Sequence, residues 1–154
     1  MPPPRSFYKV NWEAYMDSST RVWTAGVLIR DYEGQVLAAT CMPALSPPRG
    51  AHPKLYVCVQ VLCFALEMGF LDIICEGPTI QSLMALKFCP MGPTIEDSWL
   101  EEIWFLIQKF RRCKFSCISS DSNQGAWILA KFGSTLNDSR VWIEEVPVIF
   151  QNSL

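Results

Sequence analysis

The sequence carries little charge and only one histidine, which narrows the kinds of site that it can form. Charged residues make up 18% of its 154 positions, and the formal net charge is −2. Because phosphate neutralisation supplies much of the affinity of duplex-binding proteins, the lack of a basic excess argues against tight nucleic-acid binding by the chain as a whole. Such binding would need a local basic patch. His52 has no cysteine near it at zinc-finger spacing, so a zinc finger is not expected.

Long apolar segments without charge are also missing. The most apolar stretch, residues 55–75, contains Gln60, Glu67 and Asp72 and is interrupted by Gly69, whereas a membrane span needs about 20 nearly uncharged residues. We therefore expect a buried helix followed by a buried strand, and no membrane association. The first residues are not followed by the apolar segment of a secretory signal. We expect an intracellular protein, nuclear or cytoplasmic, that is not secreted.

The seven cysteines show no pattern of a disulfide framework or a metal site. Their number is odd, and no CxxC pair occurs. Several lie in apolar runs, as Cys58 and Cys75 do. We expect buried free thiols in a reducing compartment.

The length and composition favour one domain with a substantial core. Half of the residues are hydrophobic, so the chain has enough apolar surface to bury. We expect a single domain over residues 3–150, with residues 1–6 and 148–154 as loose termini.

The periodicity of apolar residues and the turn signals predict an alternating α/β chain. The predicted strands are residues 7–15, 21–30, 35–41, 71–75 and 114–118, and the predicted helices are residues 55–68, 79–88, 98–110 and 123–132. Three consecutive strands form an antiparallel meander, and helical crossovers make the last two strands parallel. The prediction is a mixed five-stranded sheet with helices on both faces, with the first strand between the second and the fourth, and the fifth beyond the fourth. Four residues of the first helix should face inward: Leu55, Val59, Leu62 and Leu66.

Short motifs along the chain, taken together, are similar to those of one family. They are Lys9-Val10-Asn11-Trp12 after Pro3-Pro4, residues 25–31 followed by Gly34, residues 65–70 and 74–77, then Asn123, Ala126, Leu129 and Ala130, and finally Trp142 and Pro147. In this order and spacing they resemble the plant-type ribonuclease H-like domains, which occur alone and at the ends of retroelement polyproteins. The resemblance covers residues 3–150 and implies the same mixed α/β fold.

The resemblance also implies where catalytic residues would lie. Active members of the family hydrolyse the RNA strand of RNA–DNA hybrids with two divalent metal ions, which clustered carboxylates hold. The four family positions fall here on Glu13, Lys54, Pro78 and Trp127. Only one carboxylate remains, and the ammonium group of Lys54 would repel Mg²⁺. We expect a domain that is not an enzyme and needs no cofactor.

Two other interpretations stay open. Glu76 shares a strand face with Pro78, and Asp121 lies near the last helix. With Glu13 they could form a relocated Mg²⁺ site, in which case the domain would be a metal-dependent hybrid ribonuclease. Alternatively, the chain is a decaying retroelement-derived copy without a selected role.

A basic cluster near the third predicted helix marks a candidate binding surface. Residues 109–114 contain four cations and an interleaved phenylalanine, although cations at a helix C-terminus also favour the helix dipole. We expect Arg111 and Arg112, with Lys54, to contact RNA–DNA hybrid or RNA weakly. Trp127 could stack on a base or simply fill space against the sheet. A protein partner is the alternative to nucleic acid.

Overall fold

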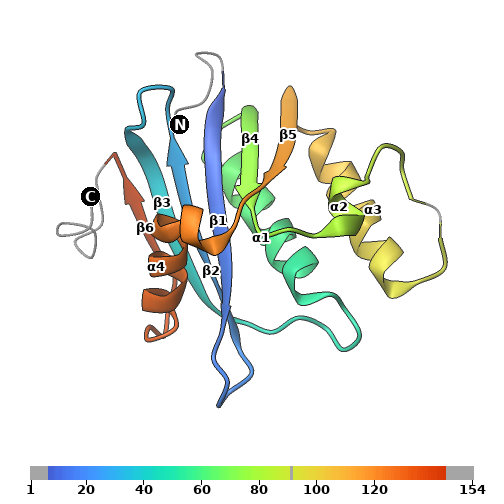
Figure 1. Ribbon diagram of the computed structural model, residues 1–154, viewed down its shortest axis with the longest axis horizontal. Coiled ribbons are helices and arrows are strands. Elements are labelled where there is room, and N and C mark those ends of the chain that lie inside the picture. The colour runs from blue at the N-terminus through green and yellow to red at the C-terminus, as the bar shows by residue number, and fades with distance from the viewer. Residues whose placement is uncertain (1–6, 91, 145–154) are drawn as a thin grey trace.

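The fold is a six-stranded sheet with helices on both sides, seen in a computed structural model that describes residues 7–90 and 92–144 (Figure 1). The elements in chain order are β1 (Tyr8–Met16), β2 (Trp23–Arg30), β3 (Val36–Leu45), α1 (Pro53–Glu67), β4 (Asp72–Gly77), α2 (Gln81–Met84), α3 (Ile95–Ile107), β5 (Arg112–Cys117), the 3-10 turn η1 (Ser120–Ser122), α4 (Gln124–Gly133) and β6 (Arg140–Ile143). The predicted loose termini, and Pro147, lie outside the described residues.

The sheet order is β5-β4-β1-β2-β3-β6, which confirms the predicted neighbours of the first and fifth strands. The first three strands are antiparallel, and β4 and β5 run parallel to β1. Within the described part of the chain the sheet has six strands, so the count of five was wrong. The additional strand, β6, pairs antiparallel with β3 from Ala38↔Ile143 to Cys41↔Arg140. Its four residues are too few to show a clear strand period, so only pairing with β3 identifies it.

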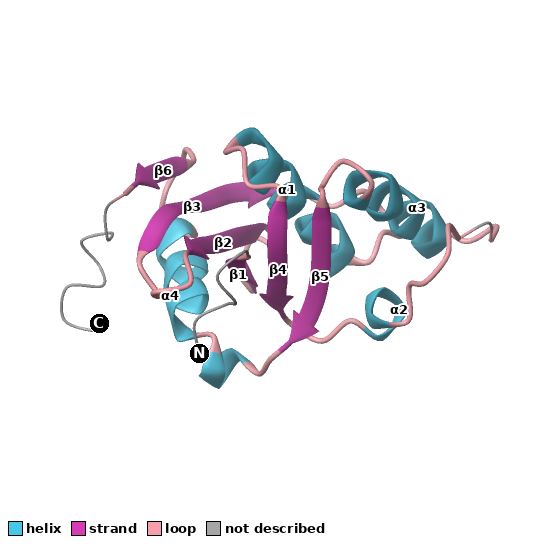
Figure 2. Cartoon of the chain, turned by 90° about the horizontal axis from the view of Figure 1, so that it is seen from above, coloured by secondary structure: helices cyan, strands magenta, loops and turns pink. Residues whose placement is uncertain are grey.

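The helices cover both faces of the sheet, as predicted (Figure 2). The helix α1 lies on one face, and α3 packs against it through the edge-to-face pair Tyr56–Trp99. Of the α1 residues predicted to face inward, Leu55, Val59 and Leu62 are buried, and Leu66 packs against the core while partly exposed. The first and third predicted helices are thus confirmed in type and position.

The helix α4 covers the opposite face at an unusually close distance. A Cβ on Gly26 of β2 would overlap the carbonyl oxygen of Ala126 and the nitrogen of Ala130. The glycine therefore lets the helix backbone rest directly on the strand. Because Gly26 pairs with Glu13 of β1, this contact also places the start of α4 over the centre of the sheet.

The helices α2 and α3 differ most from their predicted ranges, 79–88 and 98–110, and each does so for a local reason. The helix α3 begins at Ile95 rather than Ser98, because Thr94 and Asp97 form a capping box. The helix α2 is a single turn instead of the predicted residues 79–88, and only Leu83 in it is buried. A short helix with so little burial is not extended by its own propensity.

The cysteines lie at several depths in the fold. All seven cysteines are free; three are buried, three are partly exposed and Cys117 is exposed, so burial was predicted correctly for only some of them. Among the described residues, no helix has both the length and the apolar character needed to cross a bilayer.

Candidate functional site

The candidate site lies on the α4 face of the central strand. Side chains alternate along β1, so Val10 and Trp12 join the core beneath α1 while Asn11 and Glu13 point towards α4. Both polar side chains are buried: Asn11 is 4% exposed and Glu13 is 2% exposed. Buried polar groups need hydrogen-bond partners, and each has several.

Both carboxylate oxygens of Glu13 accept hydrogen bonds. Oε2 accepts from Nδ2 of Asn123 at 2.8 Å, and Oε1 accepts from the hydroxyl of Ser120 at 3.4 Å. Burial raises the pKa of Glu13, and these two hydrogen bonds and the positive charge of Lys54 partly oppose that rise. The carboxylate is thus held by neighbouring side chains at a point where solvent hardly reaches.

The second carboxylate near β1, that of Glu76, is also occupied. Its Oε1 accepts from Nδ2 of Asn11 at 2.9 Å and lies 3.5 Å from Nζ of Lys9. Asn11 in turn donates to Oδ1 of Asn123 at 3.1 Å and accepts from a terminal nitrogen of Arg30 at 2.7 Å. The result is a continuous polar network that joins β1, β2, β4 and the start of α4.

Asn123 connects the two halves of this network. It is the residue before α4, yet its side chain does not cap the helix. Its Nδ2 instead donates to the Trp12 carbonyl at 2.8 Å and to Glu13. The Asn-x-x-Ala-x-x-Leu-Ala pattern found in the sequence marked this residue, but only the fold shows what its side chain contacts.

The four positions that the resemblance assigns to catalysis lie around this network. Lys54, in the first turn of α1, is close enough for its charge to lower the pKa of Glu13. Pro78 directly follows β4 and offers no side-chain ligand. Trp127 packs edge-to-face on Tyr15 with ring centroids 5.5 Å apart, while its side chain also lines a shallow cavity with Asp121 and Gln124. Trp127 therefore contacts a side chain of β1 and is partly exposed, and both its space-filling role and a base-stacking role stay predictions.

The residues of the relocated metal site are only partly brought together. Glu13 and Glu76 lie on the same sheet face and are linked through Asn11 and Asn123. Asp121 is exposed in the turn η1. Among residues 7–90 and 92–144, no group of three or more histidine, cysteine, aspartate or glutamate residues is placed to hold a metal ion. A donor set with two occupied carboxylates and nearby cations fits a two-ion magnesium centre poorly.

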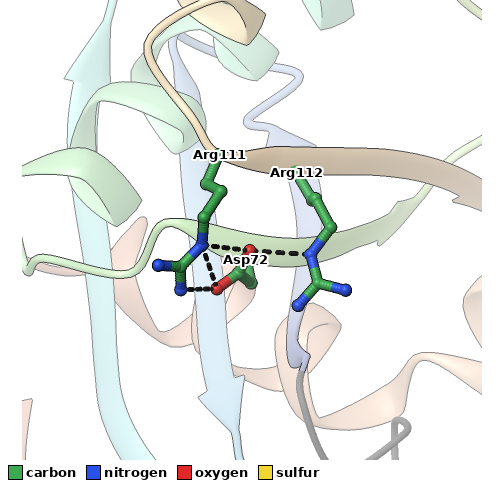
Figure 3. A network of polar contacts seen from close by, with 3 residues as sticks. All are labelled: Asp72, Arg111 and Arg112. Carbon is green, nitrogen blue, oxygen red and sulfur yellow. Dashed lines mark hydrogen bonds and ion pairs between the residues drawn. The ribbon is translucent and has the colours of Figure 1, made fainter.

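Arg111 and Arg112 lie elsewhere, at the junction of α3 and β5 (Figure 3). Arg111 Nε donates to both oxygens of Asp72 at 3.0 Å, its terminal nitrogen also binds Oδ2, and Arg112 Nε donates to Oδ1 at 2.9 Å. The two guanidinium groups hold the pKa of Asp72 well below its usual range. Arg112 also stacks on the Phe7 ring, 4.2 Å from its centroid. These arginines thus neutralise a carboxylate as well as facing solvent.

The structure does not bring Lys54 and the two arginines to one place. Asp72, which binds the two arginines, is next to Ile73, and Ile73 pairs with Tyr8 of β1. Glu13, which is near Lys54, lies five residues beyond Tyr8 along β1. Five residues of a strand span roughly 17 Å. A ligand that touches both regions must span a distance of this order. The sequence could not reveal the separation between Lys54 and the two arginines, because this separation depends on strand register.

Comparison with solved structures identifies the fold as that of ribonuclease H. The ribonuclease H1 of the archaeon Halobacterium salinarum superposes with a TM-score of 0.66 at 14% identity, covering 82% of this chain and 96% of that one. The compost-derived LC11 ribonuclease H1 in complex with an RNA/DNA hybrid gives 0.63 at 12% identity, covering 81% and 94%. The foamy viral protease–reverse transcriptase in complex with dsDNA gives 0.59 at 11% identity, covering 87% and 99%.

The sequence also matches a family model directly. The model of the reverse transcriptase-like family matches residues 11–133, from the β1 network through α4. The chain therefore belongs to this family and is a ribonuclease H-like domain, as the motifs indicated. No curated protein matches the chain significantly.

Proposed function

We propose that this domain is a non-catalytic ribonuclease H-like module that binds nucleic acid weakly. The observation that carries the proposal is that the two carboxylates on the α4 face already have hydrogen-bond partners and cations near them. Both oxygens of Glu13 and one oxygen of Glu76 accept hydrogen bonds, and Lys9, Arg30 and Lys54 lie in or beside the same network. Three cations against two carboxylates repel divalent metal ions, where the family's chemistry needs an excess of negative charge.

Loss of the metal ions would remove the chemical step. Hydrolysis of a phosphodiester by this family requires an activated water and a stabilised leaving oxygen, both of which the two ions supply. At two of the family's catalytic positions, Pro78 and Trp127 have no side-chain oxygen that could hold a metal ion. The nucleic-acid partner we propose is RNA–DNA hybrid or RNA, in keeping with the hybrid and dsDNA bound by the similar structures. The free thiols are consistent with a reducing, intracellular compartment, nuclear or cytoplasmic.

A cleavage assay tests the absence of catalysis. Purified protein with millimolar Mg²⁺ or Mn²⁺ should not cleave an RNA–DNA hybrid above background. The assay should include Glu13→Gln, Glu76→Gln and Asp121→Asn. Cleavage that is abolished by Glu13→Gln would overturn the proposal and establish the alternative, a metal-dependent hybrid ribonuclease with relocated carboxylates.

Restoring the family's ligands provides the converse test. The triple variant Lys54→Glu, Pro78→Asp and Trp127→Asp replaces a cation and two non-ligands by carboxylates. It should bind Mn²⁺ in a titration where the unmodified chain does not, and a further Glu13→Asp change shortens the remaining acid by one methylene group. Equal Mn²⁺ binding by the triple variant and the unmodified chain would contradict the electrostatic argument.

Binding is expected to be weak and sensitive to salt. With two or three phosphates neutralised by Lys54, Arg111 and Arg112, the log–log dependence of affinity on salt should have a slope of about −2 to −3. Nanomolar hybrid binding at physiological salt would point to a larger basic surface than these residues form. No measurable binding to hybrid or RNA would favour a protein partner instead.

A further inference from the structure

The shallow cavity beside Trp127 lies between the turn η1 and the first two turns of α4. Its volume is about 350 Å³, and it is lined by Ser120, Asp121, Gln124, Trp127 and Ile128. Within residues 7–90 and 92–144, this lining contains an indole ring, a carboxylate and an amide but no cation. The cavity therefore offers a flat apolar surface beside polar groups, which suits a planar ligand better than a phosphate.

Trp127 supplies the flat surface. The residue is half-buried, and it stands at one of the four positions that the resemblance assigns to catalysis. Its contact with Tyr15, with 5.5 Å between the ring centroids and an interplanar angle of 68°, holds the indole in one orientation. An indole that is held in place and also reaches a cavity is a stacking surface for a nucleobase.

Asp121 and Gln124 supply polar groups beside the indole. Both residues are exposed, and neither side chain has a hydrogen-bond or ion-pair partner among the described residues. An ionised carboxylate only accepts hydrogen bonds, whereas an amide both donates and accepts them. The pair can therefore accept from two adjacent N–H groups of a ligand and donate to a neighbouring carbonyl oxygen.

We propose that this cavity binds an unpaired guanine base of single-stranded RNA. Among the RNA bases, only guanine presents adjacent N–H donors, on N1 and N2, followed by a carbonyl oxygen, O6, along its Watson–Crick edge. The carboxylate of Asp121 accepts from N1 and N2, and the amide of Gln124 donates to O6, while the base stacks on Trp127. Adenine, cytosine and uracil each place an acceptor next to their donor, and the carboxylate repels that acceptor. Because the Watson–Crick edge is used, a base in a duplex does not fit.

Charge favours a base over a phosphate in this cavity. Ser120, on the lining, donates to Oε1 of the buried carboxylate of Glu13 at 3.4 Å, so a second carboxylate lies close to the cavity. Two carboxylates disfavour a phosphate group at the same place. The charge of Lys54 acts on Glu13 as well, so this cation is available to the phosphate of a nucleotide whose base lies on Trp127.

The inference rests on the proposed function, because it assigns a sequence preference to the weak nucleic-acid binding proposed above. It adds to Lys54 and the two arginines a contact that reads the base rather than the phosphate. The bases of an RNA–DNA hybrid are paired, so hybrid binding should not depend on Trp127. Titrations with hybrid and with single strands therefore separate the two proposals.

Short labelled oligoribonucleotides are the probes for the test. UUGUU, UUAUU and UUIUU are titrated with the protein at low salt, and fluorescence anisotropy measures the affinity of each. Inosine, the central residue of UUIUU, lacks the N2 amino group of guanosine and keeps N1 and O6. UUGUU should bind at least about fivefold more tightly than UUAUU, with UUIUU between them, because a bidentate contact to a base discriminates by this much or more.

Variants at the cavity assign the preference to its residues. Asp121→Asn should remove most of the preference for guanine, whereas Asp138→Asn, the same change at another exposed aspartate, should keep it. Trp127→Leu should weaken UUGUU binding about tenfold through loss of stacking, and Trp127→Phe should restore part of the affinity. The matched control is Trp99→Leu, because Trp99 is also half-buried and packs edge-to-face on a tyrosine; it should bind as the unmodified chain does. Circular dichroism checks the fold of each variant.

The outcomes separate the two proposals. Equal affinities for the oligomers, no measurable binding to any of them, or UUGUU binding that Asp121→Asn or Trp127→Leu leaves unchanged would overturn the guanine site. Hybrid binding without a guanine preference in the single strands would overturn the guanine site alone and leave the proposed function in place. Hybrid cleavage that depends on Glu13 would overturn the proposed function and leave the guanine preference untouched.

Discussion

Asn123, just before α4, donates a hydrogen bond of 2.8 Å to the buried carboxylate of Glu13 on β1, across 110 residues of sequence. The same amide nitrogen donates to the Trp12 carbonyl, so one side chain fixes the helix to both the backbone and the side chains of the central strand. Because Oδ1 of Asn123 accepts from Asn11, the amide uses its donors and its acceptor within the network.

Asn123→Ala should therefore destabilise the protein strongly. The change leaves the Trp12 carbonyl, the Glu13 carboxylate and one donor of Asn11 without this partner in a buried setting. We expect a loss of about 3 kcal/mol, at the upper end for an unpaired buried polar group, or roughly 10 °C in Tm. Thermal unfolding followed by circular dichroism measures it. The control Asn137→Ala, at an exposed position, should change Tm little, and an equally small effect of Asn123→Ala would contradict the role assigned to the network.

Glu13→Gln should change the pH dependence of stability. The folded-state pKa of Glu13 is raised above its ordinary value of 4.5, so the folded protein favours the protonated acid. Its contribution to stability is present below that ordinary value and is lost as the pH rises through the folded-state pKa. The Gln variant does not lose it, so its Tm relative to the unmodified protein should rise between pH 4 and pH 8. A Tm difference independent of pH would contradict the raised pKa.

Asp72→Asn should have the opposite pH dependence. Arg111 and Arg112 hold the pKa of Asp72 far below its ordinary value of 3.8, so the ionised carboxylate stabilises the fold above that value. The stabilisation is lost as the pH falls through the folded-state pKa. The variant should melt at a lower temperature at pH 7, and the deficit should shrink below pH 3.8. The same change at exposed Asp138 serves as the control and should produce no comparable deficit.

Gly26→Ala and Gly125→Ala should have opposite effects. A Cβ at Gly26 meets the backbone of α4, which cannot yield without moving the helix, and overpacking of this kind costs about 1–3 kcal/mol. A Cβ at Gly125 meets only the end of the Leu28 side chain, and alanine within a helix is favoured over glycine by about 1 kcal/mol. Chemical denaturation measures the free energy of unfolding of each variant and of the unmodified chain. If Gly26→Ala were as stable as the unmodified chain, α4 would not lie as close to β2 as described.

The order of elements and the type of sheet could be read from the sequence. Apolar periodicity separated the long helix beginning near Leu55 from the strand that follows Gly69, and the crossover rule then made the last two predicted strands parallel. The positions of Glu13 and Asn123 were also found, because they sit at fixed intervals from motif residues. These features depend on neighbours in the chain, which the sequence contains explicitly.

Other features were decided by tertiary structure. The pairing of β6 with β3, the capture of Arg111 and Arg112 by Asp72, and the contact of Asn123 with Glu13 each join residues far apart in the chain. The sequence presented the two arginines as a basic patch and Glu76 as a candidate ligand, since charge alone does not show which partner is within reach. Strand register and the close approach of α4 to Gly26 set those distances, and a hydrogen bond or ion pair forms only when its two groups are brought within about 3–4 Å.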